Sequence, residues 1–470
     1  MSPSVSSHSS SVDPRVQTTF DIVNWDELSS LGCTLAQLPQ GSCHWGEQLS
    51  GGYNLVRFLH LHDDQQTIVV ARVPLRSEDA MSEEHFSAIS KRIESEVVTM
   101  KYVETHTTIP VPHVLQHSVH AEQKVRSPYI LMSKVDGTPL SSVWDDMDDD
   151  KRRIVLRQVI DILLELWSRR FDKKGALFNQ ADSSLHVQSS SLFADPDDTG
   201  TRHRLSTTSY SHAADYWLAY ANARIHDIDE SDFGSDTKPY MHSQAWFMRS
   251  LTPALFDPSI DTYGCPLSPG DFHSQNIMIT DADSSHPRIT AIIDWEFSGP
   301  DFVSSFALYP LFIVDHPHWD EDHPLRARNV RDQATFDELI LEAERNRSPT
   351  DGPQLSSLIS KSSGIYLFQQ AMCFPGMYPA VYPLFFAHVF GDDEDFSTDY
   401  YWALMENGIL NRDKQRFDRE TEVWLEARKV LGEEAVGRNL TRKEFKELVL
   451  KCLERFDDGG GVRRWLASSH

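Results

Sequence analysis

Two short segments in the second half of the chain constrain its fold more than any other feature. The first runs from Gly270 to Asn276 (GDFHSQN), and the second runs from Ile292 to Glu296 (IIDWE). Between them, apolar residues over 277–280 and 289–293 alternate as they do in a β-hairpin. Because the first strand begins after Asn276 and the second ends at Asp294, the hairpin predicts that these two side chains lie together at one end.

Asp271 stands five residues before Asn276, in the loop that leads into the first strand. A carboxylate in this place can accept the proton of a substrate hydroxyl, and Asn276 and Asp294 offer the oxygen ligands that Mg²⁺ takes. Taken singly, an Asp or Asn at such a position is more often a turn or helix cap. The ordered combination favours chemistry, so we expect Asp271 to be the catalytic base and Asn276 and Asp294 to be the metal ligands.

These residues resemble the aminoglycoside phosphotransferase and choline kinase superfamily. Its members have a loop of the form His-Gly-Asp-x-x-x-x-Asn and a strand that ends in Ile-Asp-Trp/Phe-Glu, and the resemblance extends from about Trp45 to Pro300. It implies a fungal-type member with a protein-kinase-like fold, ATP and Mg²⁺ as cofactors, and transfer of the γ-phosphoryl group to a hydroxyl of a small molecule. The chain departs from the pattern at Pro269, where the superfamily usually has His.

The first third of the chain predicts a small β-lobe with one long helix. Period-two patterns predict the strands, and an apolar stripe predicts a helix over 83–105. The expected strands are Cys43–Leu49, Tyr53–Leu61, Ile68–Pro74, Val114–His120 and Tyr129–Ser133. After Gly137 the pattern is mostly helical, beginning with a helix over 147–171. The predicted fold class is α+β, protein-kinase-like and two-lobed, with a small antiparallel β N-lobe and a large, mainly α-helical C-lobe.

Four residues of the N-lobe are candidates for ordering a nucleotide. Gly51 and Gly52 lie between two strands and lack the Cβ that would keep phosphates away, although most such pairs are simple hairpin turns. Arg72 stands in the third strand, where kinases have a Lys. Glu96 falls on the apolar stripe of the long helix, where a carboxylate is costly without a cation. We therefore expect a Glu96–Arg72 ion pair; the alternative is that each side chain reaches solvent.

Other roles are assigned by position or remain open. By position alone, Met132, Ser133 and Val135 are expected to bind the adenine where the lobes join. Glu296 either reaches a second magnesium ion or caps the following turn. His273 is expected to pack or to touch the substrate, because Asp271 already serves as the base. Side chains after Phe302 are expected to form the acceptor site, with walls among Trp319, Tyr366, Tyr378, Tyr382 and Tyr400.

We expect four parts along the chain. Residues 1–19 are predicted to be a disordered Ser-rich tail, and residues 20–135 the nucleotide-binding N-lobe. Residues 136–414 are the predicted C-lobe, with the catalytic loop, the metal site and the substrate helices; within it, residues 179–208 predict a long surface loop. Residues 415–470 predict C-terminal helices and a frayed tail.

Composition restricts the partners. The net charge of −26 argues against a nucleic-acid partner and suits a cationic small substrate, although solubility explains it equally well. No apolar run approaches the roughly 20 residues of a membrane span, and no motif implies a protein partner. The absence of a signal pattern predicts a cytoplasmic location, with a mitochondrial one left open. Five scattered cysteines suit a reducing compartment and argue against a disulfide scaffold.

Two classes of function fit these patterns. The first is a small-molecule kinase. The second is a catalytically inactive, kinase-like module that binds a nucleotide or metabolite, which Pro269 and the missing Lys of the third strand would suit. The chain has no Gly-x-x-x-x-Gly-Lys-Ser/Thr loop and none of the His-Arg-Asp, Asp-Phe-Gly and Ala-Pro-Glu motifs, which argues against a P-loop NTPase and a protein kinase.

Overall fold

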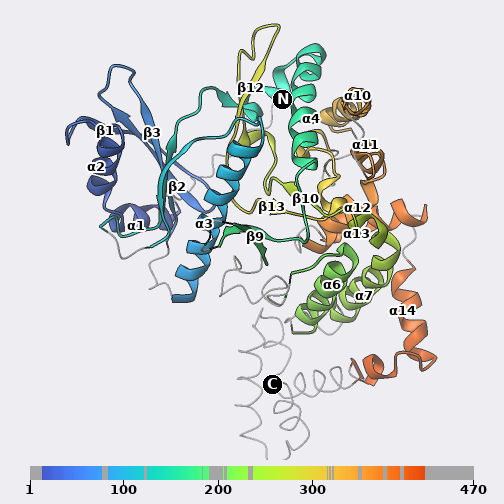
Figure 1. Ribbon diagram of the computed structural model, residues 1–470. Helices are drawn as coiled ribbons and strands as arrows, with labels where there is room; N and C mark the ends of the chain where they lie inside the picture. The colour runs from blue at the N-terminus through green and yellow to red at the C-terminus, as the bar shows by residue number, and fades with distance from the viewer. Residues whose placement is uncertain are drawn as a thin grey trace, which may run out of the picture. The chain divides into compact units, whose positions relative to one another are not determined.

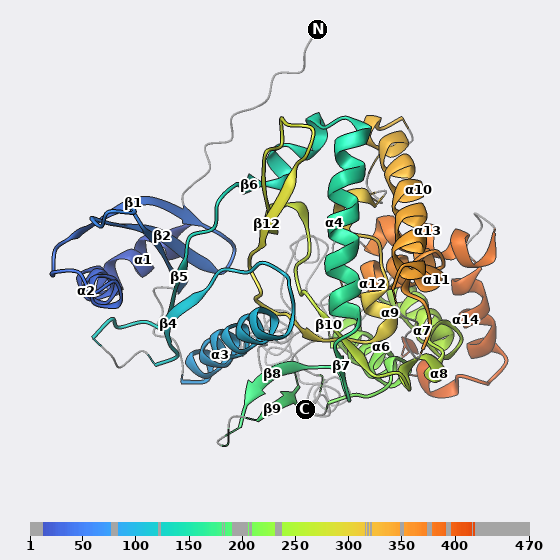
Figure 2. The same cartoon turned by 45° about the horizontal axis from the view of Figure 1, so that its top comes forward.

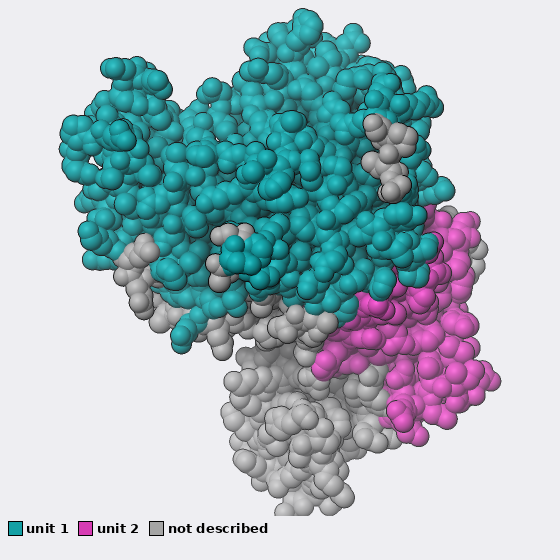
Figure 3. Space-filling model, in the orientation of Figure 1, with its two compact units in different colours: residues 1–198, 206–213, 258–363 teal, residues 199–205, 214–257, 364–470 magenta. Residues whose placement is uncertain are grey.

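The computed structural model describes residues 13–418, apart from residues 77–82, 121–123, 181, 183, 190–204, 206–208, 231–236, 315, 317–318, 320–321, 348–351, 374–377, 392–395 and 416. The chain forms two compact units, which Figure 3 shows in different colours. Unit 1 comprises residues 1–198, 206–213 and 258–363, and unit 2 comprises residues 199–205, 214–257 and 364–470. The predicted N-lobe and the predicted catalytic loop both belong to unit 1.

Unit 1 contains a five-stranded antiparallel sheet (Figure 1). Its strand order is β1-β2-β3-β5-β4. Its strands are β1 (Cys43–Ser50), β2 (Asn54–Leu61), β3 (Ile68–Pro74), β4 (Val114–Ser118) and β5 (Tyr129–Ser133). The long helix α3 (Glu83–His106) lies between β3 and β4 in sequence. The five strands and the helix are confirmed, with ends within two residues of those expected.

Helices cover both faces of this sheet, and the side chains of each strand point alternately to one face and to the other. Leu55, Leu59 and Val69 lie on the face that packs against α1 (Pro14–Ile22) and α2 (Trp25–Leu35). Ile130 and Met132 of β5 lie on the opposite face, in the core that α3 helps to form. The apolar stripe of α3 is therefore buried against the sheet, and Glu96 is carried into that interior with it.

Helix α1 begins inside the segment for which the sequence predicted a disordered tail. The side chain of Asp13 accepts a hydrogen bond from the backbone N–H of Arg15, and Pro14 occupies the first helical position, where a missing N–H costs nothing. Val16 and Thr19 are buried. For residues 14–19 the prediction of a tail is therefore wrong, since a capped helix packs onto the sheet; residues 1–12 lie outside the described ranges.

Two cysteines that are ten residues apart in sequence meet between α2 and β1. The Sγ atoms of Cys33 and Cys43 are 3.1 Å apart, and both are free thiols. The pKa of the Cys43 thiol is raised to about 11, mainly by burial and secondly by the contact with Cys33. The thiol is therefore protonated at neutral pH. Their spacing in the sequence gave no sign of this contact.

The rest of unit 1 is mainly helical around a small hairpin. The elements that carry it are α4 (Asp149–Trp167), β10 (Cys265–Ser268), β11 (Ile277–Thr280), β12 (Arg288–Ile292), α9 (Val303–Phe306), α10 (Pro324–Arg345) and α11 (Leu355–Ile359). Short pieces complete it: β6 (Thr138–Pro139), β7 (Arg170–Phe171), β13 (Gly299–Pro300), α8 (Pro258–Asp261) and the 3-10 turns η1 (Leu140–Ser142), η2 (Trp144–Asp146), η4 (Ser274–Asn276) and η5 (Leu311–Ile313). This element order confirms the α+β, protein-kinase-like fold class.

The predicted long surface loop over 179–208 is wrong for part of its length. Strand β9 (Leu185–Gln188) pairs antiparallel with β8 (Ala176–Asn179) and forms a second hairpin. Val187 is buried, and Leu185 packs against the main core. Two apolar residues in alternation were enough to form an edge strand once a neighbouring strand was present. Most residues of 190–208 lie outside the described ranges.

Unit 2 is helical in its described residues. Its helices are α6 (Ala213–Glu230), α7 (Thr237–Leu255), α12 (Ser363–Cys373), α13 (Tyr378–Phe390) and α14 (Ser397–Glu406), although the first residues of α6 and α12, Ala213 and Ser363, belong to unit 1. Aromatic rings fill its core: Trp217 stacks on Phe256 at 5.9 Å, and Phe368 meets both of them edge-on. The predicted helices over 415–470 lie almost entirely outside the described residues.

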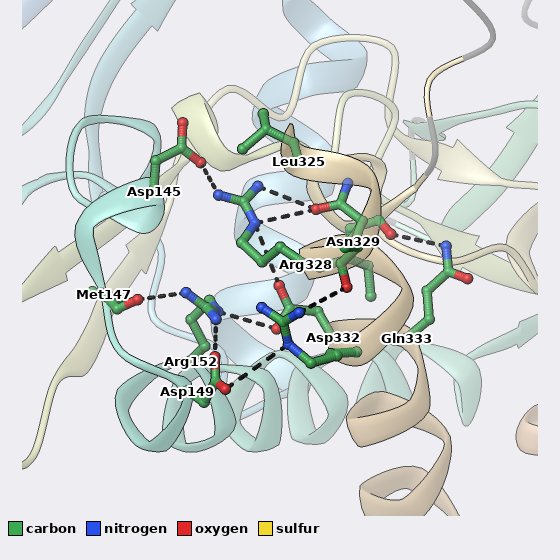
Figure 4. A network of polar contacts seen from close by, with 12 residues as sticks. Asp145, Met147, Asp149, Arg152, Leu325, Arg328, Asn329, Asp332 and Gln333 are labelled. Carbon is green, nitrogen blue, oxygen red and sulfur yellow. Dashed lines mark hydrogen bonds and ion pairs between the residues drawn. The ribbon is translucent and has the colours of Figure 1, made fainter. Parts of the chain in front are cut away.

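A buried polar network joins α4 to α10, which run side by side (Figures 2 and 4). Arg152 Nε donates to Asp332 Oδ1 at 3.1 Å, and Arg152 also binds Asp149 and the carbonyl of Met147. Arg328 binds Asp145 and approaches Asp332 Oδ2 at 3.7 Å. Arg152 and Asp332 are both about 95% buried, so each charge depends on the other for compensation.

We predict that Arg152→Met destabilises the protein by about 3 kcal/mol, because it leaves the buried Asp332 carboxylate without its main partner. Urea unfolding followed by circular dichroism measures this. The neighbouring variant Arg153→Met is the control: its exposed ion pair with Glu338 spans 2.7 Å, and losing it costs below about 1 kcal/mol. The double variant Arg152→Met/Asp332→Leu should recover much of the loss. Equal effects of the two single variants would contradict the network.

Candidate active site

The loop that carries Asp271 begins directly after strand β10. That strand ends at Ser268, which pairs with Gly299, so Pro269 is the first residue outside the ladder and its missing N–H breaks no strand pairing. The N–H of Gly270 donates to Ser298 Oγ at 2.9 Å. A Cβ at position 270 would lie 2.5 Å from the backbone carbon of Phe297, so only glycine allows this approach.

Asp271, His273 and Asn276 contact one another within this loop. The Nδ2 of Asn276 donates to the backbone carbonyl of Asp271 at 3.0 Å and reaches its Oδ2 at 3.4 Å. His273 Nε2 lies 3.2 Å from the same Oδ2. Asp271 remains half exposed, with 49% of its side chain accessible, so its carboxylate is held in place but open to a ligand.

These contacts shift two pKa values in opposite directions. The hydrogen bond from His273 lowers the pKa of Asp271, more than partial burial raises it. The same contact raises the pKa of His273. Asp271 is therefore ionised at neutral pH and can accept a hydrogen bond from a hydroxyl group. The sequence offered no sign that His273 would pair with Asp271.

The β11–β12 hairpin brings the backbone of Ile293, the residue before Asp294, against Asn276. Ile277 pairs with Ile292, and the N–H of Ile293 donates to the carbonyl of Asn276 at 2.9 Å. The turn after the hairpin is anchored by Trp295, which is 1% exposed. Asp294 and Phe297 adopt φ angles of +59° and +62°, which side chains rarely do. Strain of this kind persists where the surroundings enforce it, often at functional sites.

Arg72 lies buried among three carboxylates, and its ion pair with Glu96 is confirmed. Its Nη1 binds Glu96, and its Nη2 lies 2.7 Å from Asp294 Oδ1 and 2.5 Å from Glu296 Oε2. The ion pair links β3 to α3, and the other two contacts link β3 to the end of the hairpin. Arg72 thus joins the N-lobe to the predicted metal residues.

Five ionisable side chains meet in this cluster. The cations are Arg72 and Arg92, and the carboxyl groups belong to Glu96, Asp294 and Glu296. Burial opposes the charge of Arg72, but the three carboxylates outweigh it and raise the pKa of Arg72. Burial, with repulsion from Glu296 and Asp294, raises the pKa of Glu96 despite the contact with Arg72. The side chain of Asp294 is 38% exposed, so its carboxylate is the one in this cluster that is most open to a cation.

Two oxygen atoms of the predicted metal residues suit a magnesium ion. The nitrogen of the Asn276 amide is engaged by Asp271, and no described residue donates to its Oδ1. Arg72 binds Oδ1 of Asp294, and no contact to Oδ2 is present in the described part of the chain. Mg²⁺ is commonly held by one or two protein oxygens, with phosphates and waters completing an octahedron. The donor set therefore fits Mg²⁺.

The residues expected at the nucleotide lie along the N-lobe. The N–H of Ser133 donates to the carbonyl of His113, and the N–H of Lys134 donates to the carbonyl of Ile68. The N–H of Val135 has no acceptor among the described residues. Met132 is buried in β5. Gly51 N–H donates to the carbonyl of Asn54 at 2.9 Å and closes the turn after β1. A Cβ at Gly52 would meet nothing within 4 Å, so no packing inside the protein requires glycine there.

Of the two roles that the sequence left open for Glu296, capping the following turn is wrong, because no backbone N–H of the described residues donates to it. Glu296 is 4% exposed. Its carboxylate forms ion pairs with Arg72 and with Arg92 Nε, the latter at 2.7 Å, and accepts a hydrogen bond from Asn54 Nδ2 at 2.6 Å. Sequence reasoning missed Arg92 and Asn54. Arg92 stands one helical turn before Glu96, so the spacing offered a signal for it. Asn54 offered none.

One of the expected acceptor walls belongs to a hydrophobic core. Tyr382 is 1% exposed, and its hydroxyl donates to Ser397 Oγ at 2.6 Å within unit 2. This buried position contradicts a wall role for Tyr382. In unit 1, Trp319 stacks on His323 with ring centroids 4.3 Å apart. The side chain of Tyr378 lies outside the description.

Several known proteins are similar to this chain, although no protein-family model matches it. A subtelomeric hrmA-associated cluster protein of Aspergillus fumigatus is 30% identical over 132 residues, which are 28% of this chain and 24% of that protein. The protein named altered inheritance of mitochondria protein 9, mitochondrial, of Meyerozyma guilliermondii is 30% identical over 134 residues, 28% of this chain and 21% of its own. The matches thus span about a quarter of these relatives' length.

Similar solved structures include small-molecule phosphotransferases. A putative aminoglycoside phosphotransferase of Ralstonia eutropha is 16% identical, with a TM-score of 0.42 over 79% of this chain and 93% of that one. Macrolide 2'-phosphotransferase of Brachybacterium faecium is 13% identical, with a TM-score of 0.41 over 79% of this chain and 99% of its own. Separately, none of the described helices is long and apolar enough to cross a membrane.

The His273–Asp271 contact predicts a pH-dependent stability difference. The lowered pKa of Asp271 contributes stability above about pH 3.9, lost as the pH falls through the lowered value. The raised pKa of His273 contributes stability below about pH 6.5, lost as the pH rises through the raised value. His273→Asn should therefore lower the urea midpoint more at pH 5.5 than at pH 9. Because Asp271 is half exposed, we expect less than about 1 kcal/mol.

The control for this measurement is His286→Asn, in the loop of the β11–β12 hairpin. His286 contacts Ser285, and the described residues include no carboxylate partner for it. Its substitution should shift the midpoint equally at both pH values. An NMR titration adds a direct reading: the pKa of Asp271 should rise in His273→Asn. An unchanged Asp271 pKa would refute the interaction.

Proposed function

We propose that this protein is a phosphotransferase that moves the γ-phosphoryl group of ATP, with Mg²⁺, to a hydroxyl group of a small molecule. The observation that carries the proposal is that Asp271, Asn276 and Asp294 gather at the end of one hairpin, next to the buried Arg72–Glu96 pair. Phosphoryl transfer needs this set: a group that orients the acceptor, oxygen ligands for a metal and fixed positive charge.

Asp271 orients the acceptor hydroxyl and takes up its proton. The carboxylate is ionised at neutral pH and half exposed, so a hydroxyl group can donate a hydrogen bond to it. Because its pKa is lowered, it is a weak base, and most of its effect comes from holding the hydroxyl in line with the phosphorus atom.

Asn276 would hold Mg²⁺ through its Oδ1, and Asp294 would hold it through its Oδ2. When bound, the ion neutralises the negative charge of the phosphates. Arg72 adds a fixed positive charge beside Asp294, and Glu96 keeps it in place. Gly51 and Gly52 let the backbone of their turn approach the phosphates, and the N–H of Val135, beside Met132 and Ser133, serves the adenine.

The acceptor is a small molecule, and the acidic chain suits a cationic one. Trp319 and the helices that follow Phe302 are the proposed surroundings of this acceptor. The proposed location is the cytoplasm. A mitochondrial location is the alternative that the name of the Meyerozyma relative suggests.

A second candidate is a module that binds a nucleotide without turnover. The observation that favours it is that the three contacts of Arg72 all go to carboxylates, which leaves its charge directed at the protein and away from a phosphate. Nucleotide protection against thermal unfolding is expected of both candidates. Only the kinase releases ADP in proportion to an added alcohol.

We predict that Asp271→Asn lowers Mg²⁺-dependent ADP release by at least about 100-fold, because the amide cannot take up a proton. The assay couples ADP release to NADH oxidation over a panel of amino alcohols, sugars and aminoglycosides. Protection of the variant by ATP against thermal unfolding should persist, since Asp271 is not a ligand of the nucleotide in this proposal.

The matched control is Asp283→Asn, an exposed aspartate in the turn of the same hairpin. It should keep the rate of the unchanged protein. If Asp271→Asn retains turnover, the role of Asp271 as base is wrong. If the unchanged protein is protected by ATP but releases no ADP with any alcohol, the inactive module is the better description.

A further inference from the structure

Side chains from three separate elements of the N-lobe meet at Glu296. Arg72 belongs to β3, Arg92 to α3 and Asn54 to the first position of β2. Arg72 and Asn54 donate hydrogen bonds to Oε2 at 2.5 and 2.6 Å, and Arg92 Nε forms an ion pair with Oε1 at 2.7 Å without hydrogen-bond geometry. One buried carboxylate therefore ties the N-lobe to the turn that follows Asp294.

This arrangement leaves Glu296 unsuited to a metal ion. Oε2 accepts hydrogen bonds from Arg72 and Asn54, Oε1 faces the Arg92 guanidinium as an ion pair, and the side chain is 5% exposed. Two guanidinium groups within hydrogen-bond distance would repel a divalent cation at the same oxygens. Among the described residues no backbone N–H donates to Glu296 either, so it does not cap the turn.

Asn54 connects this carboxylate to the glycine turn. Its side chain donates to Glu296, while its backbone carbonyl accepts the N–H of Gly51 at 2.9 Å. The position of Glu296 thus fixes the residue that closes the Gly51-Gly52 turn. A displacement of Glu296 is passed directly to that turn.

Arg92 is held over Glu296 by two aromatic rings. Its guanidinium lies 5.2 Å from the ring centre of Tyr53 and 5.5 Å from that of Phe297. The two rings meet edge to face at 5.4 Å. Cation–π contacts and exclusion of water strengthen the Arg92–Glu296 pair beyond that of an exposed ion pair. The contact also involves Phe297, one of the two residues with positive φ after the hairpin.

We propose that Glu296 is a positioning residue that closes the N-lobe onto the hairpin of Asp294, with Arg92 as its dedicated partner. This inference rests on the proposed function for its role toward the nucleotide. Glu296 sets the place of Arg72 and of the glycine turn, and through them the binding of phosphates. It acts through these residues and does not touch the metal.

The test is a double-variant cycle with Glu296→Gln, Arg92→Gln and the combination. In urea unfolding without any ligand, the two substitutions should be non-additive, with the double variant losing clearly less than the sum of the single losses. In thermal-shift titrations each single variant should bind ATP about tenfold more weakly or worse, as expected for loss of a buried charged hydrogen bond. This loss should appear with Mg²⁺ and equally with EDTA.

The magnesium titration separates positioning from metal binding. At saturating ATP, the Mg²⁺ concentration that gives half of the maximal protection should be the same in Glu296→Gln and in the unchanged protein. Lys91→Gln and Glu94→Gln, on the same helix and outside the cluster, are the controls and should leave ATP affinity unchanged. Asn54→Ala is a milder variant that keeps both arginines; it should weaken ATP binding less than Glu296→Gln, because it frees only the glycine turn.

Three outcomes would overturn the inference. An increase of about tenfold or more in the Mg²⁺ requirement of Glu296→Gln, absent in Arg92→Gln, would make Glu296 a metal ligand. Additive urea effects would remove the coupling to Arg92. Unchanged ATP affinity in Glu296→Gln and Asn54→Ala would remove the positioning role. If ATP does not protect the unchanged protein, the proposed function fails. The urea unfolding of the single and double variants without ligand then decides by itself whether Glu296 closes the N-lobe onto the hairpin.

Discussion

The burial of the Arg72 guanidinium is the constraint on which the rest of the site depends. A buried cation is tolerated only where carboxylates surround it. Glu96 arrives on helix α3, and Asp294 and Glu296 arrive at the end of the β11–β12 hairpin. One strand residue thus requires a helix and a distant hairpin to meet at a single point.

Tight packing of backbone against backbone, more than side-chain hydrogen bonds, fixes the loop and the turn around this cluster. Gly270 lies so near Phe297 that no other residue fits, and Trp295 anchors the turn from the core. Asp294 and Phe297 accept unfavourable φ angles as a result. Pro269 interrupts no strand pairing at the start of this loop, because it lies after the last paired residue of β10.

Much of the fold could be predicted because its elements have strong local patterns. Strand β3 and helix α3 were located to within a residue by alternation and by an apolar stripe. Glu96 was paired with Arg72 because a carboxylate on a buried helical face demands a cation. The hairpin β8–β9 and the start of α1 were missed. Their patterns are short, and they form only because a neighbouring strand or a sheet face is available.

The sequence by itself determined the α+β class and the order of most elements, because periodicity is a local property. Only the tertiary structure decided what Glu296 contacts, that His273 lowers the pKa of Asp271, and that Arg92 and Asn54 join the cluster. These depend on side chains far apart in sequence meeting in three dimensions. Which charged side chains pair with each other depends on their distance and burial in the folded protein, and neither quantity can be read from the sequence.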